Sequence, residues 1–394
     1  MINNLFEELK QLEEELITIR RDLHMHPELS NEEKRTPAFI ADHLKSLGLE
    51  VRTNFGGNGV VGYLRGEQPG KTIALRADFD ALPIQDEKNV PYKSTVPGVA
   101  HACGHDVHTA ALLGVARVLS SRKSTLAGTV VFIHQFAEEV APGGAKRMIA
   151  DGCLEGVDAV YGAHVWSENQ IGEVLFNEGY TMAAADTFEI TISGRGGHGA
   201  MPHLAIDPVV AASQLVMSLQ QIVSRNVDPL KAAVVTVGSL HSGHALNVIP
   251  DSASVGGTVR TYDPAIRELA EKKIRDAVKA VEIHTGVKGS IDYVYGHTSL
   301  YNHAEPTRQL KQLAEQYLPE VYVKKMNAFM GAEDFAYYLE EVPGTFFFVG
   351  GRNEELDAVY PHHHPKFDVD EKAISTIGRL FFLSLLNHGV VSAE

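Results

Sequence analysis

The order of strand and helix patterns along the chain is the feature that most constrains its fold. Up to about residue 182, apolar runs typical of buried strands alternate with segments of helical periodicity such as 107–121; the runs lie at 59–65, 72–77, 129–136 and 158–163. The same character returns after about residue 297, with a helix over 304–317, a strand over 345–350 and a final helix near 370–387. This alternation predicts a layered α/β domain with a mostly parallel sheet.

The middle of the chain has a different order. Its patterns predict strand 187–193, helix 207–224, strand 232–239, strand 247–261, helix 264–285 and strand 289–295. This is the β-α-β-β-α-β order of ferredoxin-like units. Because 394 residues suit two domains, we expect a discontinuous α/β domain, 1–182 and 297–394, with an inserted domain over 183–296.

The first forty residues predict two helices. Apolar positions at helical spacing indicate one helix over 5–26. The run Ser30-Asn31-Glu32-Glu33 has the pattern of a capping box, which predicts a second helix ending near Leu47.

Charge and composition exclude several classes of partner. The formal charge of −15 and the lack of clustered Lys and Arg argue against nucleic acid. No apolar run approaches the ~20 residues of a membrane span, and the start of the chain lacks the features of a signal peptide. Cys103 and Cys153 are too few for a disulfide framework. We therefore expect a cytoplasmic protein with neither a nucleic-acid nor a membrane partner.

The segment His101-Ala102-Cys103-Gly104-His105-Asp106-Val107-His108 is the strongest chemical signal in the chain. A thiol and an imidazole lie two residues apart, and the adjacent pair Glu138-Glu139 follows at the end of an apolar run. Soft and borderline ligands followed by two carboxylates indicate a transition-metal site with its own general base.

Several candidate side chains fall where predicted strands end. In sheets of this kind, ligands collect at the carboxyl ends of the strands. The residues at such ends are Asp78, Asp80, Glu138, Glu139 and His164. Two of these residues, Glu139 and His164, give five candidate ligands together with Cys103, His105 and one of the three histidines 362–364. Five ligands suit two metal ions about 3.5–4 Å apart with a bridging thiolate. Since adjacent residues rarely bind one ion together, one of Glu138 and Glu139 is expected to bind metal and the other to carry protons.

Other interpretations of these motifs stay open at this point. The pair Glu138-Glu139 could be a solvated turn, His164 a packed core histidine, and Cys103 the nucleophile of a metal-free hydrolase. A metal-binding module without turnover is a further alternative. The run Gly194–Gly199 matches G-x-G-x-x-G, but no helix pattern begins there and no acid follows about 20 residues later, so a glycine-rich turn that presents His198 is favoured over a dinucleotide site.

These motifs together carry a family resemblance that covers nearly the whole chain. In order, they are 77–83, 101–108, Glu138-Glu139 with Gly143-Gly144, 162–165, 194–203, 247–250, 256–260, 330–335 and 363–368. They resemble the amidohydrolase branch of the aminoacylase/carboxypeptidase-G-type dinuclear metallopeptidases, which includes hippurate hydrolases, N-acetyl-diaminopimelate deacetylases and indole-acetyl-amino-acid hydrolases. The Cys-Gly-His-Asp motif is specific to this branch.

The resemblance implies a role for each matching residue. It implies Glu138 as the general base and acid, His198 as an oxyanion-stabilising residue that reaches the partner subunit's site, and Asn247 and Arg260 as substrate-binding residues. The implied metal ligands are Cys103, His105, Glu139, His164 and His363. Many relatives carry a His-x-Asp ligand motif where this chain has Asp78-Phe79-Asp80, so both aspartates are expected to support the ligands instead.

The activity that the resemblance implies is hydrolysis of the amide bond of N-acyl amino acids by metal-activated water. It also implies two divalent ions, zinc or manganese, and a homodimer or higher homo-oligomer formed through the inserted domain, which would act as a lid. A dinuclear exopeptidase of the dipeptidase or carboxypeptidase type is the alternative.

Overall fold

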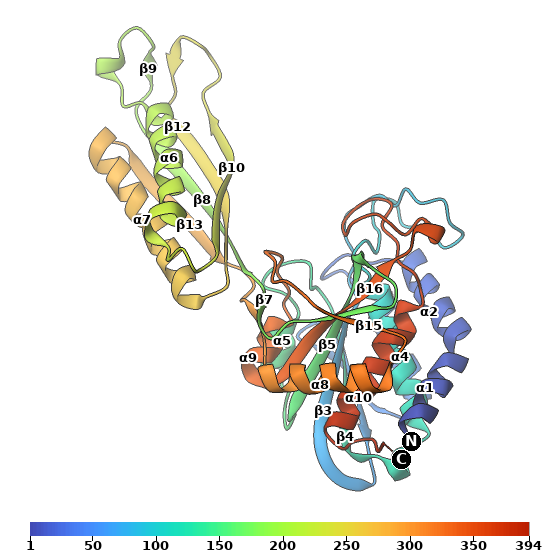
Figure 1. Ribbon diagram of the computed structural model, residues 1–394. Helices are drawn as coiled ribbons and strands as arrows, with labels where there is room; N and C mark the ends of the chain where they lie inside the picture. Colours follow the sequence, from blue (N-terminus) through green and yellow to red (C-terminus); the bar gives the residue numbers. More distant parts are fainter. Residues whose placement is uncertain (394) are drawn as a thin grey trace. The chain divides into compact units, whose positions relative to one another are not determined.

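The structure is a computed structural model that describes residues 1–393, and these divide into two compact units (Figure 1). The first unit comprises Met1–Thr181, Tyr301–Asn327 and the chain from Asp334 onward. The second comprises Met182–Leu300 together with the short segment Ala328–Glu333. No sequence pattern indicated that this segment belongs to the second unit. The chain passes between the units at β7 (Gly179–Met182), at β14 (Leu300–Asn302) and at both ends of the short segment.

The first unit is built on an eight-stranded mixed sheet in the order β1-β2-β4-β3-β5-β16-β6-β15. Its strands are β1 (Glu50–Phe55), β2 (Gly59–Arg65), β3 (Gln68–Asp78), β4 (Ala127–Gln135), β5 (Ala159–Gln170), β6 (Glu173–Phe176), β15 (Tyr322–Lys325) and β16 (Gly344–Arg352).

The expectation of a mostly parallel sheet is right for the centre of this sheet and wrong for its flanks. Strands β4, β3, β5 and β16 are mutually parallel, whereas β1 and β2 pair antiparallel, as do β2 with β4 and β16 with β6. The cause is connection length, because a parallel return needs a crossover of a dozen or more residues. Only three residues separate β1 from β2, and two separate β5 from β6.

The helices of the first unit are α1 (Ile2–Gln11), α2 (Glu13–Met25), α3 (Arg35–Ser46), α4 (His105–Ser120), α5 (Ala145–Ala150), α8 (Ala304–Tyr317), α9 (Ala336–Glu341) and α10 (Ala373–Asn387). Helices α1, α2 and α10 pack against α4, and α4 in turn contacts β3, β4 and β5 (Figure 1). Almost every residue of α4 is buried, which suits its run of Ala, Leu, Val and Gly. The site segment that leads into α4 is therefore anchored by a central helix.

The N-terminal region differs from its sequence pattern in two ways. The helix predicted over 5–26 is two helices, α1 and α2, divided at Leu12. The prediction that Ser30–Glu33 caps the second helix is wrong, because α3 begins at Arg35. The carboxylate of Glu28 instead accepts hydrogen bonds from the backbone N–H groups of residues 34–36 at 2.8–2.9 Å. A carboxylate from outside the helix thus satisfies the amide groups that a cap would satisfy.

The second unit has the element order β8-α6-β10-β12-α7-β13 and an antiparallel sheet in the order β10-β12-β8-β13. Its elements are β8 (Ala184–Ser193), β9 (Gly197–His198), α6 (Pro208–Asn226), β10 (Ala233–Ser242), β11 (Val248–Ile249), β12 (Ser252–Thr261), α7 (Pro264–Thr285) and β13 (Lys288–Tyr295). Helices α6 and α7 pack on the sheet over a core that includes Ile190, Leu215, Val255 and Ile274. Each helix begins with Pro and is capped by the aspartate before it, Asp207 or Asp263, a favourable arrangement at a helix start.

None of the helices within residues 1–393 combines the length and hydropathy that crossing a bilayer requires.

Candidate metal centre

Cys103 and His105 are presented by a tight turn at the start of α4. Gly104 between them has a φ of 94°, and a Cβ atom there would lie 2.3 Å from Cγ1 of Val165. Only glycine fits such a position without strain. Its place in the Cys-Gly-His motif is therefore a steric requirement of the turn.

The orientation of His105 is set by Asp80. Nδ1 of His105 lies 2.9 Å from the carbonyl oxygen of Asp80 and 3.1 Å from its Oδ1, so Nδ1–H donates and the Nε2 lone pair is left available. Burial lowers the pKa of His105, but the charges of Asp78 and Asp80 outweigh it and raise the pKa to about 10. A metal bound at Nε2 would therefore displace a proton.

His164 approaches the thiol from the neighbouring strand. It lies within β5, which continues to Gln170 where the sequence pattern ended the strand at residue 163. Its Nδ1 donates to the carbonyl of Val165 at 2.6 Å, and its Nε2 lies 3.4 Å from Sγ of Cys103. Burial and the adjacent His108 and His362 hold the pKa of His164 well below its usual range, which keeps the ring in the neutral form that binds metal.

The pair Glu138-Glu139 follows a strained residue after β4. Ala137 has a φ of 49°, and its N–H donates to Oε1 of Glu33 at 2.9 Å. A non-glycine residue in this region is held there by its surroundings, and such residues cluster at functional sites. Oε1 of Glu139 lies 3.8 Å from Nε2 of His105 and 3.5 Å from Nε2 of His363.

The three consecutive histidines have different environments. His363 has a φ of 64°, its N–H donates to the carbonyl of Ala102 at 2.8 Å, and its side chain is 52% exposed. His362 is turned inward, where its Nε2 accepts from the N–H of Ser167 at 3.2 Å and its ring packs on Trp166. The geometry therefore brings the free Nε2 of His363, rather than that of His362, to Glu139.

The described residues hold five groups of potential ligand atoms that lie within 4.8 Å of one another, and three of these groups contain at least two of the predicted ligands. These three are Cys103 with His105 and His164, Cys103 with Glu139 and His363, and His105 with Glu138 and Glu139. Nε2 of His105 and Oε1 of Glu139 are buried and have no hydrogen-bond partner among the described residues. Buried polar atoms without partners are costly, so sulfur, nitrogen and oxygen atoms gathered in this way fit divalent transition metals.

The two aspartates of the Asp-Phe-Asp motif hold the residues of this cluster in place through hydrogen bonds. Asp80 binds His105 and also accepts from the N–H of Glu139 at 3.0 Å. Asp78 accepts from Nδ1 of His108 at 2.6 Å, and Nε2 of His108 accepts from the N–H of Val165 at 2.9 Å. Both nitrogens of His108 are thus engaged within the protein. Burial opposes ionisation of Asp78, but Arg76 and the two histidines hold its pKa well below its usual range.

Two residues with a place near the site went unnoticed in the sequence. The hydroxyl of Ser30 donates to Oδ2 of Asp80 at 2.7 Å, and buried Glu33 holds the turn before Glu138 through Ala137. Burial raises the pKa of Glu33. Their sequence pattern indicated a helix cap, and no local signal marks a contact with partners 50 and 104 positions away.

The thiol of Cys103 is a poor nucleophile in these surroundings without metal. Burial and the carboxylates of Glu139, Glu138 and Asp78 raise its pKa well above the usual range. The thiolate is the reactive form, and it is disfavoured unless a cation is bound beside it. This argues against a metal-free cysteine hydrolase.

The other three residues singled out in the sequence lie in the second unit. His198 and Asn247 are exposed neighbours at one end of it, where β9 pairs with β11 and the N–H of Gly199 donates to the carbonyl of Asn247 at 2.9 Å. Arg260 lies near the other end of β12, paired with Ala185 of β8. Arg260 lies eight positions along β12 from Ser252, which corresponds to about 27 Å of strand.

Comparison with known proteins agrees with the chemistry of this cluster. The family model of peptidase family M20/M25/M40 matches residues 74–385, which include every ligand atom described above. The chain belongs to this family.

Relatives within the M20/M25/M40 family cover almost the full chain. YhaA of Bacillus subtilis (strain 168), which is named as an amidohydrolase, is 50% identical over 374 residues, 94% of each chain. An N-acetyl-L-cysteine deacetylase of the same organism is 42% identical over 93% of this chain and 86% of its own. The crystal structure of the Bacillus subtilis YXEP protein, described as a dinuclear metal binding peptidase from the M20 family, aligns with a TM-score of 0.84 and 34% identity over 97% of this chain and all of that one.

Family membership and the ligand cluster together define the protein's class. It is a metal-dependent hydrolase that cleaves amide bonds in small molecules and binds divalent metal ions. The resemblance that the sequence motifs indicated is confirmed.

Proposed function

We propose that the protein hydrolyses the amide bond of N-acyl amino acids with two divalent ions, zinc or manganese. The observation that carries this proposal is the thiol of Cys103, which is shared by two groups of potential ligand atoms. An amidohydrolase and an N-acetyl-L-cysteine deacetylase among the relatives support an acylated amino acid as substrate.

The five ligands divide into two sets around Cys103. His105 and His164 complete one set with it, and Glu139 and His363 complete the other. When bound, the ions supply Lewis acidity that polarises the amide carbonyl and lowers the pKa of a water molecule.

Glu138 carries the protons in this proposal. It is buried beside His105 and Glu139, whereas Oε1 of Glu139 lies within 4 Å of Nε2 of both His105 and His363, which suits Glu139 to bind metal. Glu138 takes a proton from water as the amide carbon is attacked, and returns it to the amine nitrogen as the C–N bond breaks.

His198 suits the stabilisation of the oxyanion. Its Nδ1 accepts from the N–H of Ala200 at 3.0 Å, so Nε2 carries the proton and can donate. Asn247 beside it and Arg260 are proposed to bind the substrate's carbonyl or carboxylate. Because His198 and Arg260 lie near opposite ends of β12, one copy of the second unit cannot place both on one small substrate. We therefore propose a homodimer formed through the second unit, in which each site receives His198 from the partner subunit.

The alternative is an exopeptidase, which the peptidase description of the YXEP protein favours. Initial rates with N-acetyl, N-benzoyl and indole-acetyl amino acids, measured beside dipeptides with free amino groups, distinguish the two. Dipeptides cleaved faster than every N-acyl substrate would overturn the proposed substrate class.

The metal-based mechanism is tested by the adjacent glutamates. Glu138→Gln should keep both metals, measured by elemental analysis, and lose about 10²–10⁴-fold in kcat. Glu139→Gln should lose metal as well as activity. Near wild-type activity in Glu138→Gln would contradict its proton-carrying role. As a second check, metal-loaded Cys103 should resist iodoacetamide, and after chelation its alkylation should require a pH high enough to form the thiolate.

A further inference from the structure

The segment that carries His363 has no regular structure of its own. Residues 359–372, all of them described, form neither helix nor strand. Hydrogen bonds from elsewhere in the first unit hold it instead: the carbonyl of Ala102 accepts from His363, and the N–H of Glu87 donates to the carbonyl of Pro365 at 2.9 Å. The position of His363 therefore depends on contacts made by distant residues.

Arg20 of α2 is the first of two buried cations that contact this segment. Its side chain is fully buried, and its Nε donates to Oδ2 of Asp106 at 2.7 Å. Its other nitrogens bind Asp368 at 2.8 Å and Glu371 at 3.2 Å. Asp106 directly follows His105, so one guanidinium joins the two segments that carry metal ligands.

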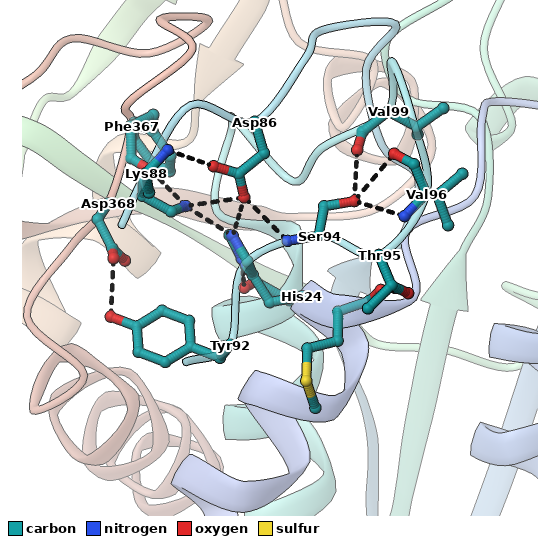
Figure 2. Close-up of polar contacts among 12 residues, drawn as sticks. His24, Asp86, Lys88, Tyr92, Ser94, Thr95, Val96, Val99, Phe367 and Asp368 are labelled. Atoms are coloured by element: carbon teal, nitrogen blue, oxygen red, sulfur yellow. Dashed lines mark hydrogen bonds and ion pairs between the residues drawn. The ribbon is translucent and has the colours of Figure 1, made fainter. Parts of the chain in front are cut away.

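Lys88 is the second cation. Its Nζ donates to the carbonyl of Phe367 at 2.7 Å and lies 2.6 Å from Nε2 of His24. Nδ1 of His24 lies 2.7 Å from Oδ2 of Asp106. Figure 2 shows Lys88, His24 and Asp86 pointing toward one another, with Phe367 and Asp368 alongside. A second route thus runs from the start of α4 to the His363 segment.

Tyr92 completes the cluster on the side of Asp368. Its hydroxyl donates to Oδ2 of Asp368 at 2.8 Å, and its ring lies 5.0 Å from the guanidinium carbon of Arg20. Buried ion pairs contribute little to stability on balance, because desolvation offsets their attraction. The consequence of this cluster therefore lies in the parts of the chain whose positions it sets.

We propose that Arg20 and Lys88 are positioning residues of the metal centre, which hold the His363 segment at a fixed distance from the Cys103–His105 turn. This inference rests on the proposed ligand set. Among the segments that carry proposed ligands, Lys88 and Tyr92 directly contact only the His363 segment, and Lys88 reaches the start of α4 only through His24. His105 and His164 belong to α4 and β5 and are held by Asp80 and by the carbonyl of Val165. Weakening the cluster should therefore loosen one metal and spare the other.

The test is a metal titration of the full-length protein. Metal-free wild type, Lys88→Met and Tyr92→Phe are titrated with Zn²⁺ against a chromophoric chelator, which yields two dissociation constants for each protein. In Lys88→Met one of the two ions should lose about 10–100-fold in affinity, the usual effect of removing a group that orients a ligand. The other ion should change by less than about threefold on the same reasoning. Tyr92→Phe keeps the ring and removes one hydrogen bond, so the same ion should lose roughly two- to tenfold.

The matched control is Arg267→Met in the second unit. Arg267 forms a bidentate ion pair with buried Asp186, and both belong to the second unit, which holds none of the proposed metal ligands. This variant should lower the thermal midpoint of the metal-free protein and leave both constants unchanged.

Two results would overturn the inference: constants within twofold of wild type in folded Lys88→Met and Tyr92→Phe, or an equal loss of both ions. If Lys88→Met does not fold, Tyr92→Phe decides alone. A wild-type protein that binds fewer than two ions would instead overturn the proposed ligand set, and this inference with it.

Discussion

The histidines of the first unit and those at the exposed end of the second unit are held in different ways. His105 and His164 are buried, and each has Nδ1 fixed by a carbonyl or carboxylate while Nε2 faces the thiol or the carboxylates. His198 is exposed, and its support is a two-residue ladder between β9 and β11 and one hydrogen bond from Ala200.

This difference indicates two kinds of preorganisation. Metal ligands need fixed distances, and the first unit supplies them through hydrogen bonds to the opposite ring nitrogen. A donor that stabilises a transition state needs only to be in place when the substrate is bound. In the proposed mechanism His198 of the second unit is such a donor, and a partner copy or a substrate would complete the surface around it.

Within this comparison of histidines, the largest expected effect is at His198. His198→Ala should lower kcat by about 10²–10³-fold with both metals retained, as removal of one oxyanion donor does. His203→Ala, a nearby exposed histidine with no proposed role, serves as the control and should stay near wild type. Steady-state kinetics and elemental analysis measure both outcomes.

Mixing the inactive variants sharpens the same comparison. Statistical exchange of His198→Ala with Glu138→Gln should restore up to about a quarter of wild-type activity, since half of the dimers then contain one complete site of two. Exchange that mass spectrometry verifies, without recovered activity, would contradict the shared site and leave the hydrolase class intact.

The next effect tests how tightly the metal centre is built. In Gly104→Ala the new Cβ would meet Val165 at 2.3 Å, so the Cys103–His105 turn must shift and metal affinity should fall about 10–100-fold. Gly98 also has a positive φ, 74°, but nothing lies within 4 Å of an added Cβ. Gly98→Ala should cost only the backbone strain, about 1–2 kcal/mol of unfolding free energy, with unchanged metal affinity. Equal metal affinities in the two variants would show that the turn tolerates the shift.

The smallest effect concerns a buried histidine without a role at the site. Both ring nitrogens of His134 in β4 are buried without a partner among the described residues, and burial, assisted by His43, lowers its pKa to about 3. Its unfolded pKa is about 6.5, so its stability contribution is complete above that pH and is lost as the pH falls toward the folded value.

At about pH 5 this group should cost wild type about 2 kcal/mol of unfolding free energy relative to neutral pH. Urea unfolding of wild type and His134→Leu at both pH values measures it, and the variant should lose correspondingly less stability. The same loss in both proteins would mean that His134 is not held neutral.

The elements that could be predicted from the sequence are those whose own residues show the apolar pattern of a strand or a helix. The strand predicted over 59–65 is β2, whose apolar run is mostly buried, and the helix predicted over 207–224 is α6, whose buried residues recur at helical spacing. Strand β1 was missed because its first five residues are not fully buried and show no apolar alternation. Strand β15 was missed for a related reason, since it is a four-residue edge strand with no buried residue.

The candidate site divides in the same way. The sequence reveals Cys103, His105 and the glutamate pair, because a cysteine among histidines and two adjacent glutamates after an apolar run are unusual combinations. Four other residues cannot be recognised in the sequence, because each contacts a partner far along the chain and resembles an ordinary surface or capping residue. They are Ser30, Glu33, Arg20 and Lys88.

The short segment Ala328–Glu333 has a consequence for how this architecture can be divided. It belongs to the second unit, where Phe329 pairs with Met182 and the carbonyl of Gly331 accepts from the N–H of Ala183 at 2.8 Å, yet both of its neighbours in sequence belong to the first unit. A fragment of residues 182–300 would leave that strand end unpaired. Deleting the same residues from the full chain would leave Ala328–Glu333, between Asn327 and Asp334, without the strand that it contacts. Exchange of this unit between related enzymes, by recombination or by engineering, must therefore transfer two separate pieces of sequence together.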